Sequence, residues 1–422
     1  MSRIELTPPL RALSAIALML PLCGVAAPTI SIDRVQQRYP WNRLVDIDYT
    51  LSGLTGDVND YRIVFTASAV TNGVAISVVC SNFLDYAACD LPTAEGASRV
   101  TWDAAADGAG FFAKDATVAA QLVYQPVTQT DADYMIVDLS SGASSAAYPV
   151  RYVRFPRNND FSVQFNRPRY KTTHLVLRRV EAGTFTMGNG TSGAALAHTV
   201  QLTQDYYLGL FELTRTQYLS VVGGKDPSSM KHTDTPESPT AWCPVGKLPQ
   251  TTILAGDGVL ARLTARATCR GEGVGSFVLP TEAQWEYACR AGTTTKYFWG
   301  TSDALAGNYA WYKDNCLGAD QAVGLKLPNP WGFYDMAGNA DEWCNDCYAN
   351  YTDDPAYVAG GTTVDPKGVA SAANAVLRGA YWTYSETRLG DLTSYIRYNA
   401  PSGSDYSNHG LRVSLTVSGA MP

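Results

Sequence analysis

The chain changes character near residue 175, and this change limits the folds open to it more than any other feature. Before that point, short runs alternate apolar and polar residues, as in VDIDYTL at 45–51, and Gly, Asn and Asp separate the runs. After it, Trp, Gly and Asn become dense and the runs shorten. At ~100–200 residues per domain, 422 residues suggest two or three domains. We therefore expect a β domain followed by a loop-rich domain.

The N-terminus has the pattern of a secretory signal. Arg3 and Arg11 precede an apolar run at 12–22, and small residues follow at 24–27. A basic segment, a short apolar segment and small residues before the cut define such a signal, and the run is too short to span a bilayer. We expect cleavage after Ala26 and a bacterial protein that is exported to the periplasm, the cell surface or the medium. Cys23 leaves a lipoprotein signal as the alternative.

The composition argues against several classes of partner. Lys plus Arg is 32 and Asp plus Glu is 39, which gives a net charge of −7. Nucleic acids and anionic membranes attract cationic surfaces, so neither is an expected partner. No stretch after the signal is typical of a membrane span. The four His are far apart in sequence, which excludes an H-E-x-x-H metal site.

Export changes the interpretation of the cysteines, because disulfides form in oxidising compartments. Cys80 and Cys89 could close a hairpin, and Cys243 with Cys269 is a second candidate pair. Cys344-x-x-Cys347 has no second C-x-x-C to complete a zinc site. We interpret these two as core or paired cysteines.

The expected fold class is α+β. Strand candidates at 45–51, 61–65, 74–79 and 118–124 predict an all-β, sandwich-like domain over 27–130. A further strand at 134–139 and a linker occupy 131–171, a loop-rich domain spans 172–416, and 417–422 is a tail. Helices are expected over 257–268, over 281–291, and from Thr214 to Gly223. The second has a capping box of Thr281 and Gln284.

A series of motifs recurs in order along the loop-rich half. They are RRVEAGTFTMG at 178–188, YLGLFELT at 207–214, LPTEAQWEYA at 279–288, NPWGFYDMAGN at 329–339, EW at 342–343, LRG at 377–379 and GLR at 410–412. Together they resemble the formylglycine-generating enzyme family, also called the sulfatase-modifying factor family. The resemblance covers 172–416 and implies a variant of the C-type lectin fold with little regular secondary structure.

The resemblance also shows a departure from the family's chemistry. Formylglycine-generating members hold copper with two thiolates, six and eleven residues after the Arg of the LRG motif. Counting from Arg378 gives Tyr384 and Leu389, and Arg397 and Gly410 keep the family spacing. Soft thiolates suit Cu(I), whereas a phenol and an isobutyl group do not. We therefore expect no copper, no catalytic residue of the family type and no formylglycine formation.

A calcium site is a second implication of the resemblance. Its ligands would be the carboxylates of Asp335 and Glu342 and the backbone carbonyls of Gly338 and Ala340. Calcium prefers such oxygen ligands, and its role would be structural. The alternative is a Gly338-Asn339 turn in which Glu342 pairs with an Arg.

The segment 381–409 is rich in Tyr, Ser, Asn, Gly and Asp, which are typical of adaptable binding surfaces. In the family, this segment lines the exposed groove around the reactive centre. Trp382 and Arg397 fit the family framework, and His409 is expected to be a polar surface residue. The predicted ligand-binding residues are Thr383, Tyr384, Ser385, Tyr398, Asn399, Asp405, Tyr406 and Asn408.

These observations predict an exported, non-catalytic protein that binds an unknown protein or glycan ligand. One sub-branch with this fold is diversified by retroelements, which mutate adenines in asparagine codons. Changes from Asn reach Tyr, Ser, Asp, Thr and His, which are abundant in 381–409. A retroelement-diversified binder is thus one form of the hypothesis. The alternative function is an oxidoreductase with altered active-site chemistry.

Overall fold

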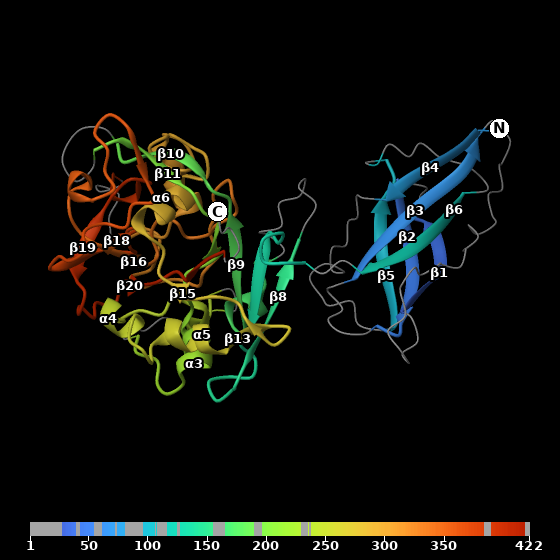
Figure 1. The fold of residues 1–422 in the computed structure, drawn as a ribbon, viewed down its shortest axis with the longest axis horizontal. Helices are drawn as coiled ribbons and strands as arrows, with labels where there is room; N and C mark the ends of the chain where they lie inside the picture. The colour runs from blue at the N-terminus through green and yellow to red at the C-terminus, as the bar shows by residue number, and fades with distance from the viewer. Residues whose placement is uncertain are drawn as a thin grey trace. The chain divides into compact units, whose positions relative to one another are not determined.

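The computed structural model describes residues 28–38, 43–54, 61–71, 74–80, 96–105, 107, 116–124, 127–154, 165–189, 196–228, 235, 238–383 and 390–417. The chain forms two compact units, Met1–Thr128 and Gln129–Pro422 (Figure 1). The predicted signal over 1–26, the thiol partner Cys89, and the site positions Tyr384, Ser385 and Leu389 lie outside the described residues.

The first unit contains two three-stranded antiparallel sheets. One has the order β1-β2-β5 and the other β4-β3-β6. The strands are β1 (Thr29–Gln37), β2 (Leu44–Ser52), β3 (Tyr61–Thr71), β4 (Val74–Cys80), β5 (Gly96–Asp103) and β6 (Thr117–Tyr124).

Both sheets contribute to a single apolar core. Along β2, Val45, Ile47, Tyr49 and Leu51 are buried while the residues between them are more exposed, as the alternation predicts. The ring of Tyr49 meets Phe65 of the other sheet edge to face, with the ring centroids 5.5 Å apart. The unit is therefore a small β-sandwich.

The second unit is built around an eight-stranded sheet with the order β14-β13-β8-β7-β9-β12-β21-β15. Its strands are β7 (Tyr134–Asp138), β8 (Tyr148–Val153), β9 (His174–Val180), β12 (Tyr206–Gly209), β13 (Ala267–Cys269), β14 (Glu272–Gly273), β15 (Phe277–Val278) and β21 (Ser414–Thr416). The segment 131–171 therefore supplies two strands to this sheet, and the prediction of one strand followed by a linker is wrong in this respect.

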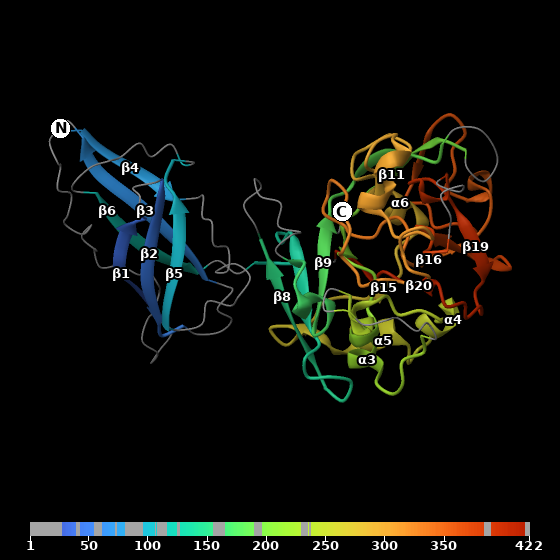
Figure 2. The ribbon, with the colours of Figure 1, turned by 180° about the vertical axis from the view of Figure 1, so that it is seen from behind.

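Two smaller sheets complete the second unit (Figure 2). The order β10-β11-β17 joins Gly183–Met187, His198–Leu202 and Thr362–Val364. The order β19-β18-β16-β20 joins Tyr398–Pro401, Asn374–Arg378, Asp341–Cys347 and His409–Gly410. The second of these sheets carries the LRG, EW and GLR motifs.

Helices in the second unit are short, and the local sequence sets their ends. Among the described residues the α-helices are α3 (Arg215–Val222), α4 (Gln250–Ile253), α5 (Val259–Arg266), α6 (Glu282–Arg290) and α7 (Ala306–Tyr309). Thr214 caps α3 and Thr281 caps α6, each in a capping box with the Gln three residues later. The three predicted helices are confirmed as α3, α5 and α6. None of the described helices is long and apolar enough to cross a membrane.

Candidate functional site

Helix α6 presents two buried carboxylates to two arginines that follow much later in the chain. Glu286 is fully buried and accepts from Arg378 of β18 and, at 2.9 Å, from Nε of Arg290. Glu282 accepts from Nη2 of Arg397 at 2.6 Å, and the Arg397 guanidinium lies over the ring of Tyr351. These pairs join α6 to the sheet β19-β18-β16-β20. Arg397 thus has the framework role that the sequence predicts.

A third buried pair joins the EW and GLR motifs. Arg412 donates from Nη2 to Oε1 of Glu342 at 2.7 Å and from Nε to Oε2 at 3.0 Å. Trp285 of α6 donates its indole N–H to Oε2 at 2.7 Å. The remaining Arg412 donors reach the carbonyls of Gly209 and Tyr334 at 2.9 Å. Every charge in this group therefore has a partner inside the fold.

Glycine is required at two positions of these motifs. Gly338 has a φ of 77°, and a Cβ there would lie 2.1 Å from the carbonyl oxygen of Trp311. Gly379 has a φ of 95°, and a Cβ there would lie 3.2 Å from the Trp285 ring. Backbone therefore packs directly on backbone and on Trp285, which explains why the motifs contain glycine there.

One oxygen of the predicted calcium site is free for a cation. Asp335 is buried, and its Oδ2 accepts from the backbone N–H of Gly324 at 2.7 Å, while Oδ1 is buried with no hydrogen-bond partner. Burial raises the Asp335 pKa to about 6. An orphaned carboxylate oxygen suits a hard cation.

The other predicted carboxylate is engaged. Glu342 uses both oxygens for Arg412 and Trp285, which is the alternative that the sequence left open. A cation at Glu342 would face a guanidinium on the same carboxylate. In the described part of the chain, no three His, Cys, Asp or Glu side chains converge as a metal site. The donor set thus fits calcium at Asp335 but only poorly at Glu342.

The turn at Asn339 organises the centre of the domain through contacts that the sequence does not predict. Asn339 donates to Oε2 of Glu212 at 2.7 Å and to the carbonyl of Gln321 at 3.2 Å, and its Oδ1 accepts from the Gln321 N–H. Burial and the nearby Asp335 raise the pKa of Glu212 well above its ordinary value. The motif D-M-A-G-N contains Asn339, but its distant partners have no local signal.

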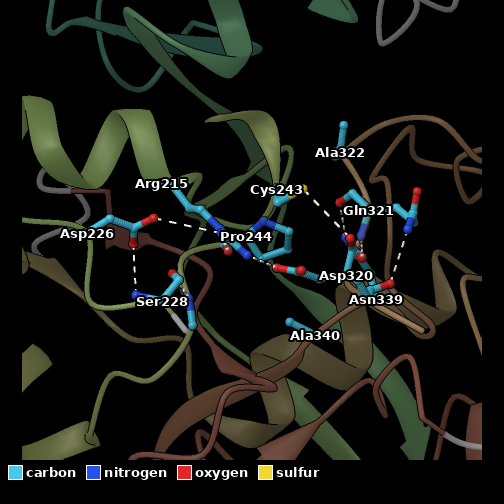
Figure 3. A network of polar contacts seen from close by, with 12 residues as sticks. Arg215, Asp226, Ser228, Cys243, Pro244, Asp320, Gln321, Ala322, Asn339 and Ala340 are labelled. Atoms are coloured by element: carbon cyan, nitrogen blue, oxygen red, sulfur yellow. Dashed lines mark hydrogen bonds and ion pairs between the residues drawn. The ribbon is translucent and has the colours of Figure 1, made fainter. Parts of the chain in front are cut away.

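Figure 3 shows how this turn is linked to helix α3. Arg215 at the start of α3 donates to Oδ2 of the buried Asp320 at 2.7 Å, and it lies 3.8 Å from Asp226. Asp320 precedes Gln321, which binds Asn339. The network therefore holds the 320–321 loop between helix α3 and the Asn339 turn. The polar groups of this network have a structural role.

The predicted ligand-binding residues fall into two groups. Tyr398 and Asn399 lie on β19, at one edge of the sheet β19-β18-β16-β20. Asp405, Tyr406 and Asn408 precede β20, at the opposite edge. The structure therefore does not bring them together as one face of that sheet. Thr383 is exposed and directly precedes residues outside the described set.

Burial separates the two tyrosines. Tyr406 is 60% exposed, as predicted. Tyr398, which pairs with Leu377 in the sheet, is half-buried, and its hydroxyl oxygen is buried. The expectation of an exposed ring is therefore wrong for Tyr398. Trp382, expected to be a buried anchor, is half-buried with a buried indole nitrogen.

His409 is buried, so the prediction of a surface residue is wrong. Its ring packs between Trp343 and Tyr406, with centroid distances of 4.9 and 5.1 Å. Nε2 lies 3.7 Å from Oδ2 of Asp341. Burial lowers the His409 pKa to about 4. The imidazole is therefore neutral near pH 7 and acts as a core ring beneath Tyr406.

The described cysteines are free thiols in this structure. The candidate pair Cys243 and Cys269 is not a disulfide, because the Cys243 thiol points to the carbonyls of Pro239 and Asp320 instead. Cys344 is fully buried, and burial raises its pKa well above the ordinary thiol value. Burial also raises the Cys289 pKa to about 12. Such protonated thiols are poor nucleophiles and poor metal ligands.

The chain belongs to the family described as the sulfatase-modifying factor enzyme 1-like domain, which matches residues 161–417. This match covers the paired arginines, the required glycines and helix α6. The fold and the motifs therefore define one domain of that family, preceded by a separate β-sandwich.

Curated relatives match over shorter stretches. A formylglycine-generating enzyme of Streptomyces coelicolor is 31% identical over 147 residues, which is 32% of this chain and 45% of the relative. A serine/threonine-protein kinase, pkn1, of Chlamydia pneumoniae is 32% identical over 33% of this chain and 21% of its own length. The chain therefore spans less than half of either relative. The solved Treponema denticola variable protein 1 is 25% identical, with a TM-score of 0.49, over 58% of this chain and 95% of that one.

Proposed function

We propose that this protein is an exported, non-catalytic binding protein that uses the sulfatase-modifying factor fold as a scaffold. The observation that carries the proposal is the replacement of both family cysteine positions by Tyr384 and Leu389. Without these thiolates the scaffold lacks the copper ligands of the family reaction. Fold alone does not fix function, so the site decides.

The charged residues of the family motifs support this proposal. Glu286, Glu342 and Arg412 are fully buried, and each is paired inside the domain. Buried charges that are paired in this way rigidify a fold, and their hydrogen-bonding groups are already used and do not bind a substrate. The rigid interior is thus a scaffold for whatever the surface loops bind.

The surface residues suggest where a ligand would bind. Thr383 and Asp405 are exposed, and Tyr406 exposes 60% of its surface on a loop that is held at Lys247, whose N–H donates to the Tyr406 carbonyl at 3.2 Å. An exposed aromatic ring on a fixed loop offers a large contact area at low entropic cost. The proposed ligand is a protein or a glycan.

A direct test uses the purified mature protein on a glycan array and in pull-downs. We expect a ligand that the wild type retains and that Tyr406→Ala loses. Val358→Ala is the matched control, because Val358 is 48% exposed and lies outside the proposed site. Retention that is unchanged in Tyr406→Ala, or lost equally in Val358→Ala, would contradict the proposal.

Two further parts of the proposal have their own tests. Cleavage after Ala26 would be read by N-terminal sequencing of the exported form. Retroelement diversification would leave a near-copy of the codons for 375–415 nearby in the DNA, differing mainly at adenines. The competing function, an oxidoreductase of altered chemistry, predicts that the pure protein consumes oxygen or retains a redox metal.

Calcium at Asp335, with the carbonyls of Gly338 and Ala340 and with Glu342, is a separate proposal. The orphaned Oδ1 of Asp335 supports it. In this site, Glu342 would share its carboxylate between the ion and Arg412. The ion would hold the 335–342 loop and would take no part in chemistry.

A further inference from the structure

The β3–β4 hairpin of the first unit exposes much apolar surface. Val70, Val74, Ile76 and Val79 expose 63%, 62%, 38% and 56% of their surface. All four belong to two neighbouring antiparallel strands. Val74 and Ile76 lie on one face of the hairpin, whereas Val70, which pairs with Ala75, lies with Val79 on the other face. Exposed apolar side chains gathered on one hairpin are typical of an interaction site.

The sandwich core covers only part of β4. Cys80 and Val78 pair with Phe65 and Ala67, which are buried, so these residues and Ile76 and Val74 share the inner face. Exposure on that face increases from 5% at Cys80 to 62% at Val74. The first half of β4 therefore extends past the region where the opposite sheet, β1-β2-β5, packs on it.

The strand is also an open edge. In the described part of the chain, β4 pairs only with β3, at the end of the order β4-β3-β6. An edge strand presents unpaired backbone N–H and C=O groups to any other strand. The sequence VAISVVC contains no charge and no Pro, the usual devices that prevent such pairing.

The other edges of the sandwich are protected. Strand β1 has a register shift between Ile32 and Arg34, and Arg34 pairs with Asp48 at 2.8 Å. Strand β5 carries Arg99, which pairs with Asp48, and Asp103, which pairs with Arg43 at 3.0 Å. Strand β6 lies beside β1. Bulges, charges and cover are recognised protections, and among the described residues β4 has none of them.

We propose that β4 is a self-association edge, at which two copies of this chain join their β4 strands antiparallel about a two-fold axis at Ser77. This pairing places the exposed Val74 of one copy opposite the covered Cys80 of the other, and Ile76 opposite Val78. The exposed half of each strand thus meets the covered half of its copy. The two identical uncharged strands bring no like charges together, and a two-fold contact closes on itself.

The size of the interface sets its strength. A seven-residue strand is ~24 Å long. A single strand edge with its flanking side chains covers less than the ~800 Å² per partner of a standard stable interface. The dimer therefore belongs to the weak class, and its population rises with protein concentration.

Sedimentation velocity of the full mature chain over a wide concentration series tests the proposal. We expect the weight-average mass of the wild type to rise toward that of a dimer. Ser77→Lys places two ammonium groups directly opposite each other and should weaken association at least about tenfold. Gln121→Lys is the matched control, because Gln121 is exposed on β6 at the other edge of the same sheet. It should associate as the wild type does.

Cross-linking fixes the register. Cβ atoms directly opposite in an antiparallel pair are ~4.5–5.5 Å apart, which is near the range for a disulfide. Ser77→Cys should therefore give a covalent dimer on mild oxidation, whereas Gln121→Cys and the wild type should not. A wild type that stays monomeric at all concentrations would overturn the proposal. A dimer that is unaffected by Ser77→Lys, or a hetero-complex with another protein's strand in place of the dimer, would also overturn it.

Discussion

Arg412 and Glu342 form a fully buried, bidentate ion pair, with Nη2 and Oε1 2.7 Å apart. Trp285 donates to the same carboxylate from helix α6. The pair thus joins the last motif of the chain to the EW motif and to the capped helix. Its loss should affect the stability of the whole domain.

We predict that Glu342→Gln destabilises the second unit by ~3–5 kcal/mol, because the change removes the carboxylate charge that pairs directly with the buried Arg412 guanidinium. Thermal and urea unfolding would measure the change. Glu181→Gln is the control, since Glu181 pairs with Arg179 at 3.4 Å but its side chain is 72% exposed. Such surface pairs contribute little, so the control should unfold as the wild type does. Equal stability of both variants would show that the buried pair is not needed.

The calcium proposal predicts a separate effect. EDTA should lower the melting temperature of the second unit, because a bound ion stabilises by ~2.7 kcal/mol at a hundredfold excess over Kd. Asp335→Asn should reduce this response, since Asp335 offers the free oxygen. Mass analysis of the native protein would detect the ion. An unchanged melting curve in EDTA, together with no bound metal, would remove calcium and leave the Arg412 pair as the role of Glu342.

Local signals in the sequence predict local structure well. The capping box at Thr281 and Gln284 marks the start of α6, and the alternation at 45–51 marks β2, because each depends on residues a few positions apart. The Arg378–Glu286 pair joins residues 92 positions apart, and no short pattern encodes such a contact.

The two tyrosines show the same limit at the candidate site. Tyr398 and Tyr406 have similar polar neighbours, yet Tyr398 pairs with Leu377 in a sheet whereas Tyr406 lies on a loop. Composition therefore indicates a segment that is typical of binding surfaces, but it does not predict which tyrosine ring is exposed. The burial of His409 has no local signal for the same reason, because it depends on Trp343 in another strand.

The protein should not convert a sulfatase-type cysteine peptide to formylglycine, with or without copper. The reason is the absence of thiols at Tyr384 and Leu389. Aldehyde trapping followed by mass spectrometry of the peptide would check this, with an active formylglycine-generating enzyme as the positive control. An aldehyde above the blank would show that another group replaces the two thiolates.

Asp346 should make stability fall as pH rises. Burial raises its pKa to about 8 in the folded protein, above the unfolded value near 3.9. Between these values the folded state binds more protons than the unfolded state, so the stabilisation is complete below about pH 4 and is lost as pH approaches 8. His409 acts in the opposite direction between about pH 4 and 6.5, because its folded pKa is lowered to about 4. The free energy of unfolding of Asp346→Asn, relative to that of the wild type, should therefore rise from pH 6.5 to 8. Urea unfolding of both proteins would measure it. Asp405→Asn, at an exposed position, should follow the wild type throughout.

Substitutions in the C-terminal segment should separate a surface ring from framework rings. Tyr406→Ala should change the free energy of unfolding by no more than ~0.5 kcal/mol, because Tyr406 is 60% exposed. Tyr398→Ala should cost more, since its ring is half-buried and its hydroxyl oxygen is buried. Trp382→Ala should cost roughly 1–3 kcal/mol, because it removes a large half-buried ring whose indole nitrogen is buried. Thermal melts of the three variants give the order directly. If Tyr406→Ala unfolds as readily as Trp382→Ala, the Tyr406 ring is part of the core through its contact with His409, and the binding surface must be sought elsewhere.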